Sequence, residues 1–167
     1  MVHKKVCMVG AFATGKTSLV SQFVDGIYSE KYQTTIGVKI AKRVVETEER
    51  TINMVLWDIH GEDEFQNVRM SYLRGTAGYL LVVDGTRRAS LDIALNLRAK
   101  VIASIGHIPC VIVVNKADLQ DTWEVTNNDI QDLQENVLPV IKSSAKTGMG
   151  VNDSFLALSH LMMQGVS

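Results

Sequence analysis

The sequence predicts an α/β fold in which a mostly parallel sheet of six strands carries one antiparallel edge strand and helices on both faces. Short continuous apolar runs alternate with segments whose apolar residues recur at helical spacing, which is typical of parallel strands connected by helices. Near the N-terminus, two strand-like runs are separated only by the charged turn Glu46 to Arg50, which predicts a hairpin and hence one antiparallel pair.

The individual elements follow from the chain in order. The six expected strands are residues 5–9, 38–45, 52–57, 79–83, 110–114 and 140–141. The first helix is expected to open at Lys16, with Leu19, Val20, Phe23 and Val24 at helical spacing. A second helix is predicted by a roughly helical stripe of Leu91, Ala94, Leu95, Val101, Ile102 and Ile105. Thr126 and Asp129 have capping-box spacing, which predicts the start of a third helix. The fourth helix is expected to bury Val151, Phe155, Leu158 and Met162.

Length and composition narrow the classes of protein. With 167 residues and no linker, residues 1–167 are expected to form one domain, and we expect a monomer. The net charge of −1 offers no basic surplus for nucleic acid as the main partner. Cys7 and Cys110 lie in apolar runs and are expected to be free thiols in a reducing cytoplasm. We also expect no signal peptide, membrane-spanning helix or lipid anchor, because no segment has the pattern of one.

The stretch from Gly10 to Thr17 fits the phosphate-binding pattern G-x-x-x-x-G-K-[ST] and predicts a P-loop NTPase. Two glycines allow the backbone N–H groups to surround phosphate oxygens. Lys16 is expected to reach the β- and γ-phosphates, and the Thr17 hydroxyl to bind Mg²⁺. The preceding apolar strand and the following helical pattern supply the context that the motif requires. The residues expected at the phosphates are Ala13, Thr14, Gly15, Lys16, Thr17 and Ser18.

Polar residues also follow other predicted strands. In parallel sheets, ligands bind at the carboxyl ends of the strands. Asp58 follows the third strand and is expected near Mg²⁺, and Gly61 would let a backbone N–H approach the γ-phosphate. The run Asn115-Lys116-Ala117-Asp118 follows the fifth strand. The Asp118 carboxylate can accept both N1–H and the 2-amino group of guanine, and adenine lacks that pair. The Lys116 stem can lie along the base.

The run Ser144-Ala145-Lys146 follows the last strand. The Ala145 N–H is expected to donate to the guanine O6, and Lys146 to flank the base. With these motifs in order, the chain resembles a Ras-superfamily small GTPase from about Lys4 to about Met163. The stretches around Thr35, Trp57 and Ser71 to Gly75 are most similar to the Rab branch.

The resemblance implies further roles. Asp25 to Gly37 would be the first switch and Gly61 to Arg74 the second, and effectors, exchange factors or activators would bind there. Thr35 would bind Mg²⁺ and sense the γ-phosphate. The resemblance implies that Tyr28 packs beside the base and that Tyr32 lies over the phosphates. The implied reaction is in-line attack of water on the γ-phosphate of GTP, with Lys16, Thr35, Gly61 and position 62 in the catalytic set.

Three residues depart from the family pattern at the catalytic end. Glu62 stands where most members have the glutamine that orients water, and its carboxylate would face an anionic phosphate. Phe12 replaces a common glycine and would crowd the γ-phosphate, and His60 replaces an alanine. We therefore expect tight binding of GTP and GDP but slow hydrolysis.

Other functions stay open at this point. The chain could be a switch with a dedicated activator, or an adaptor held in the GTP state that acts only through its partners. An ATP-dependent enzyme is disfavoured by Asp118, and a purely structural domain would leave the order of the motifs unexplained.

Overall fold

The computed structural model describes residues 1–30, 37–59 and 70–164, and its centre is a six-stranded sheet. The strands are β1 (Val2–Gly10), β2 (Val38–Glu46), β3 (Thr51–Ile59), β4 (Gly78–Asp84), β5 (Cys110–Asn115) and β6 (Val140–Lys142), and they lie in the order β2-β3-β1-β4-β5-β6. All neighbouring pairs are parallel except β2 and β3. The predicted parallel sheet with one antiparallel edge strand is therefore confirmed.

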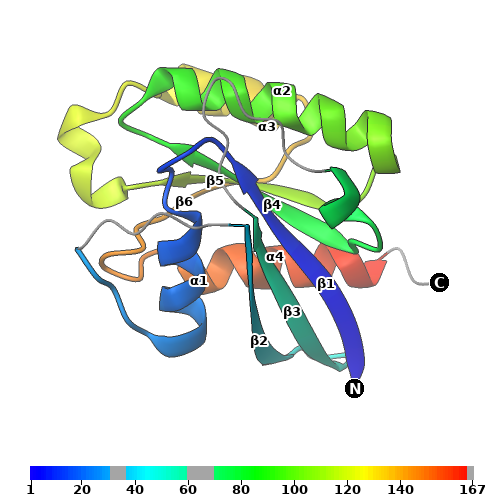
Figure 1. The fold of residues 1–167 in the computed structure, drawn as a ribbon. Coiled ribbons are helices and arrows are strands. Elements are labelled where there is room, and N and C mark those ends of the chain that lie inside the picture. The colour runs from blue at the N-terminus through cyan, green and yellow to red at the C-terminus, as the bar shows by residue number, and fades with distance from the viewer. Residues whose placement is uncertain (31–36, 60–69, 165–167) are drawn as a thin grey trace.

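The helices cover both faces of this sheet (Figure 1). They are α1 (Lys16–Asp25), α2 (Arg88–Ile105), α3 (Asn127–Glu135) and α4 (Val151–Gln164), together with the short 3₁₀ helices η1 (Met70–Leu73) and η2 (Ala117–Thr122). Residues of α1 and α4 share one buried cluster with the strands, including stacked rings of Phe23 and Phe155 at 3.8 Å. Residues of α2 and α3 share the other cluster on the opposite face.

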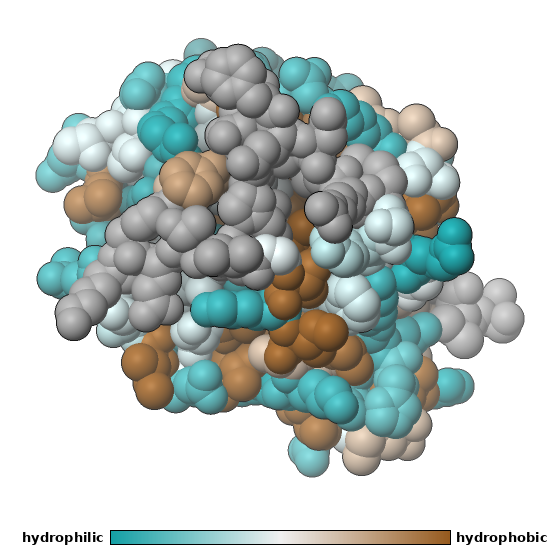
Figure 2. Space-filling model, viewed as in Figure 1, coloured by the Kyte–Doolittle hydropathy of each residue, from teal (hydrophilic) through white to brown (hydrophobic). Residues whose placement is uncertain are grey.

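The two clusters explain why the central strands read as continuous apolar runs. Every residue of β4 and of β5 is buried, because successive side chains enter opposite clusters and neither face reaches water. The β2 edge strand alternates instead, and Ile40 and Val44 are 54% and 51% exposed. Figure 2 shows hydrophobic surface over β2 and β3 on the viewed face.

Element bounds differ from the expected ones mainly at the ends. β1 begins at Val2 rather than at residue 5, because its first residues pair with Ile52, Asn53 and Met54 of β3. The polar residues His3 and Lys4 obscure the start of β1 in the sequence. The helices η1 and η2 were not predicted, because short 3₁₀ turns have no apolar period of their own. Among the described residues, no helix is both long and apolar enough to cross a membrane.

Candidate functional site

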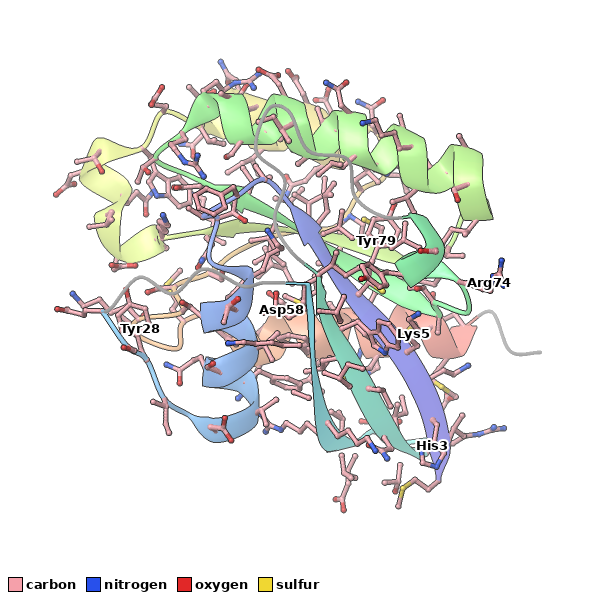
Figure 3. The ribbon with its side chains drawn as sticks, in the orientation of Figure 1. His3, Lys5, Tyr28, Asp58, Arg74 and Tyr79 are labelled. Carbon is pink, nitrogen blue, oxygen red and sulfur yellow. The ribbon has the colours of Figure 1, made fainter. Side chains whose placement is uncertain are left out.

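The predicted site residues that the structure describes gather at the carboxyl ends of the parallel strands. β1 leads into the phosphate-binding loop, and β3 carries Asp58. The ends of β5 and β6 lead into the two predicted base-binding segments, residues 115–118 and 144–146. Figure 3 shows Asp58 at the end of β3 beside α1, and Tyr28 on the segment that follows α1. This is the edge of the sheet where α/β folds hold ligands.

The phosphate-binding loop is closely fitted between β1 and α1. Gly15 has a φ of 98°, a conformation that favours glycine, and a Cβ there would overlap Asn115 Nδ2. Thr14 is fully buried and donates its hydroxyl to Ala11 O at 3.0 Å. The Lys16 ammonium lies inside the loop, where it donates to Gly10 O at 3.0 Å and to Ala11 O at 2.8 Å. The loop thus encloses a cation next to the opening of α1.

Thr17 and Asp58 meet beside this loop. The Thr17 hydroxyl donates to Asp58 Oδ2 at 2.6 Å, and Asp58 is only 2% exposed. A hydroxyl and a carboxylate side by side are oxygen ligands of the kind that Mg²⁺ accepts, so these residues fit the predicted metal. No group of three His, Cys, Asp or Glu side chains suited to a metal was found among the described residues, so any Mg²⁺ here would depend on substrate phosphates and waters as well.

Asn115 joins the phosphate-binding loop to the base-binding segments. Its Nδ2 donates to Thr14 O at 3.0 Å, and its Oδ1 accepts from the Ser143 hydroxyl at 3.1 Å and from the Ala145 N–H at 3.2 Å. Asn115 is only 2% exposed, so each of these bonds forms away from water. The Ala145 N–H that the sequence assigned to guanine therefore donates to Asn115 in this structure.

The remaining base-binding residues are also close together. The Ser144 hydroxyl donates to Asp118 Oδ1 at 2.8 Å, which links the segments after β5 and β6. The Lys146 ammonium lies 3.2 Å from Glu30 Oε1, and this hydrogen bond raises the pKa of Lys146. That ion pair connects the last segment to the loop that carries Tyr28, which is 39% exposed.

Asp84 and Arg87 belong to the same edge and were missed in the sequence. Asp84 Oδ2 accepts from Lys116 Nζ at 2.8 Å and from Arg87 Nε at 3.0 Å. Burial disfavours the charged form of Asp84, but hydrogen bonds from Lys116 and Thr86 outweigh it and lower its pKa. Asp84 ends the apolar run of β4, so the strand-end rule that found Asp58 could have found it too.

Arg87 and Lys116 also hold the phosphate-binding loop from outside. Arg87 Nη2 donates to Phe12 O at 2.6 Å, and Lys116 Nζ donates to Ala13 O at 3.1 Å. Both cations are tied to Asp84 on their other side. The backbone at Phe12, one of the residues that depart from the family pattern, is therefore held in place by a neighbouring arginine.

Several predicted residues cannot be compared with the structure. Tyr32, Thr35, His60, Gly61 and Glu62 lie outside the described residues. Their predicted roles rest on the sequence alone.

Comparisons with known proteins identify the family of the chain. The model of the Ras family matches residues 5–164. The chain is 34% identical over 161 residues to "Ras-related protein Rab-4" of Dictyostelium discoideum, covering 95% of this chain and 78% of the relative. It is 34% identical to human "Ras-related protein Rab-4B" (97% and 77% covered) and 31% identical to mouse "Ras-related protein Rab-7b" (95% and 81% covered). The chain therefore belongs to the Ras family of small GTPases and is similar to its Rab-related members.

Proposed function

We propose that this chain is a single-domain molecular switch that binds GTP and GDP with Mg²⁺ and hydrolyses GTP slowly. The observation that carries the proposal is the position of Asn115, which joins the phosphate-binding loop to both predicted base-binding segments through buried hydrogen bonds. A ligand that fills this edge would have phosphates at one end and a planar base at the other.

The phosphate end is proposed to use the residues from Ala13 to Ser18. The N–H groups at the opening of α1 and the Lys16 ammonium would stabilise the negative charge of the β- and γ-phosphates. Lys16 already lies within the loop and need only exchange its carbonyl partners for phosphate oxygens. Thr17 and Asp58 would hold Mg²⁺, with Thr35 as the third protein ligand, and the ion would neutralise charge on the phosphates.

The base end is proposed to recognise guanine through Asp118. Its carboxylate would accept N1–H and the 2-amino group, while the Ser144 hydroxyl donates to Asp118 Oδ1. Lys116 would lie along the base, with its ammonium held by Asp84 and Ala13 O. Ala145, Lys146 and Tyr28 would complete the pocket from the neighbouring segments.

Slow hydrolysis is inferred from Glu62 and Phe12. A carboxylate at position 62 would be repelled by the γ-phosphate and cannot donate the hydrogen bond of an amide. The hydrogen bond from Arg87 to Phe12 O holds the backbone at this position of the phosphate-binding loop, which supports a fixed attachment point for the bulky Phe12 side chain. Loss of the γ-phosphate would release Thr35 and Gly61, and the two switch segments would then change partners.

Protein partners are proposed to bind at residues 25–37 and 61–74. The exposed apolar residues Ile40 and Val44 of β2 lie next to the first of these segments in the chain and could extend the interface. The alternative function, a GTP-held adaptor that scarcely hydrolyses, would use the same surface. The fixed backbone of Phe12 and the carboxylate of Glu62 favour this alternative over a rapidly cycling switch.

The proposal is tested by measuring the affinities of GDP, GTP and ADP with calorimetry for the purified protein and for Asp118→Ala. The wild type should bind GDP and GTP and discriminate against ADP. Asp118→Ala should weaken GDP binding by about 10- to 100-fold, because it removes hydrogen bonds to a charged group. Asp121→Ala, an exposed carboxylate in the same 3₁₀ helix, is the matched control and should leave the affinity unchanged. Equal affinities of the wild type for GDP and ADP would refute guanine recognition.

A further inference from the structure

Trp123, the residue that follows η2, contacts the base-binding segment directly. Its indole Nε1–H donates to Lys116 O at 2.9 Å. Lys116 is the second residue of the predicted guanine motif, and its carbonyl also accepts from the Leu119 N–H at 2.9 Å. The indole therefore donates to the peptide group between Lys116 and Ala117. Lys116 is two residues before Asp118.

The backbone at Lys116 needs such support. Lys116 has a φ of 71° and a ψ of 38°, a left-handed conformation that side-chain-bearing residues rarely adopt. This conformation turns the chain from β5 into η2 and so sets where the Lys116 stem and the Asp118 carboxylate lie. A group that holds the Lys116 carbonyl therefore also holds the geometry of the two base-binding side chains.

The indole is itself fixed from two other strands. A Cβ on Gly85, in the loop after β4, would overlap the indole, so the ring lies directly on the Gly85 backbone. Gly85 N donates to Asn115 O at 3.0 Å, and Gly85 O accepts from the N–H groups of Glu124 and Val125 at 2.9 and 3.1 Å. The Lys142 ammonium of β6 lies 5.4 Å from the ring. Trp123 thus connects the ends of β4, β5 and β6.

We infer that Trp123 is a positioning residue for recognition of the guanine edge that carries N1–H and the 2-amino group, acting through the Lys116 peptide on Asp118. This inference rests on the proposed function. Its consequence concerns selectivity as well as affinity, because a displaced Asp118 would lose the bond to the 2-amino group while phosphate binding continues through Lys16 and Thr17.

The test compares GDP with inosine diphosphate, which has the same phosphates and N1–H but no 2-amino group. The ratio of their affinities reports the bond between the 2-amino group and Asp118. Trp123→Phe removes the indole N–H and keeps a ring on Gly85. We expect this variant to lower the GDP preference over inosine diphosphate by about two- to tenfold, the size of one hydrogen bond.

Two comparisons separate positioning from stability. Trp57→Phe, which changes the only other tryptophan of the chain, is the control and should keep the wild-type ratio. If Trp123→Phe does not fold, the benzothiophene analogue of tryptophan at position 123, which replaces N–H by sulfur at nearly constant shape, serves in its place. A variant with reduced thermal stability and an unchanged ratio would overturn the inference and leave Trp123 a packing residue. Failure of the wild type to bind GDP would instead refute the proposed function.

Discussion

At the scale of single residues, Asp84 organises the charges around the predicted nucleotide site. It is 1% exposed and accepts hydrogen bonds from Lys116, Arg87 and Thr86. Its two cationic partners are more exposed, at 32% and 43%, so water screens part of their interaction. Asp84 nevertheless places one cation on Ala13 O and the other on Phe12 O.

Asp84→Asn is expected to lower the free energy of unfolding by about 1–3 kcal/mol at pH 7, since it removes charged hydrogen bonds from a buried acceptor. The pKa of Asp84 is lowered in the folded state. Its stabilising contribution is therefore complete above about pH 4, the unfolded value, and is lost as the pH falls through the folded pKa. Urea unfolding at several pH values should show the difference between variant and wild type shrinking in acid. Asp92→Asn, which removes an exposed ion pair with Arg88, is the control, and a difference that does not depend on pH would contradict the account.

Val137 is a second residue-scale feature. It has a φ of 61° and is 88% exposed, so a β-branched side chain occupies a left-handed conformation without burial to compensate. Val137→Gly should raise the stability by about 0.5–1 kcal/mol, the cost of the left-handed conformation less the entropy that glycine adds to the unfolded chain. A urea midpoint that does not rise would show that the conformation carries no strain. Val137→Ala keeps a Cβ at this φ and should recover less of the stability.

At the scale of elements, the start of α3 shows how a local pattern determines structure. The sequence predicted a capping box at Thr126 and Asp129, and the structure confirms it. The Thr126 hydroxyl accepts from the Asp129 N–H at 3.1 Å, and Asp129 Oδ2 accepts from the Thr126 N–H at 2.8 Å. Both bonds are local, so no knowledge of the tertiary fold was required.

Thr126→Ala is expected to destabilise the protein by about 1 kcal/mol, because the first turn of α3 loses a hydrogen-bond acceptor. Thr126→Ser keeps the hydroxyl and should retain most of the stability. Both are measured by urea unfolding. Equal losses in the two variants would show that the methyl group, and not the cap, is responsible.

The contact between the β4–α2 loop and the segment after η2 provides a second test at this scale. Gly85→Ala places a Cβ in the indole of Trp123 and should cost about 1–3 kcal/mol through overpacking. In a Trp123→Ala background the same change should cost much less, because the obstacle is gone. A double-mutant cycle by urea unfolding measures this coupling. Additive losses would show that the two residues do not constrain each other.

At the scale of the whole molecule, the features predicted correctly from the sequence are those that local patterns determine. The apolar runs located all six strands, and the spacing in α1 and α4 identified their buried faces. In α2 the pattern was less clear. Leu97 is buried and was not included in the expected stripe, whereas Leu95 and Ile102 are only half-buried. The helix α2 packs over the central strands β1 and β4 and against η1, so its buried face is wider than the period alone predicts.

The candidate site likewise contains residues that local motifs predicted and residues that they did not. Motifs with fixed spacing identified Lys16, Thr17, Asp58 and Asn115, and the structure brings them together at one edge of the sheet. Arg87 was missed because its bond to Phe12 O joins loops that are distant in sequence. Trp123 was missed because it belongs to no motif, although it bonds a carbonyl only seven residues away and packs on the distant Gly85. Only the three-dimensional arrangement of the strand ends shows which carbonyl each of them holds.

The central claim is tested most directly by single-turnover hydrolysis of GTP with Mg²⁺, measured for the wild type and for Glu62→Gln at matched nucleotide occupancy. The account predicts that the wild type binds GTP and GDP but hydrolyses GTP at a barely detectable rate, and that Glu62→Gln accelerates hydrolysis. Rapid hydrolysis by the wild type, with no change in Glu62→Gln, would contradict the account and show that another group orients the attacking water.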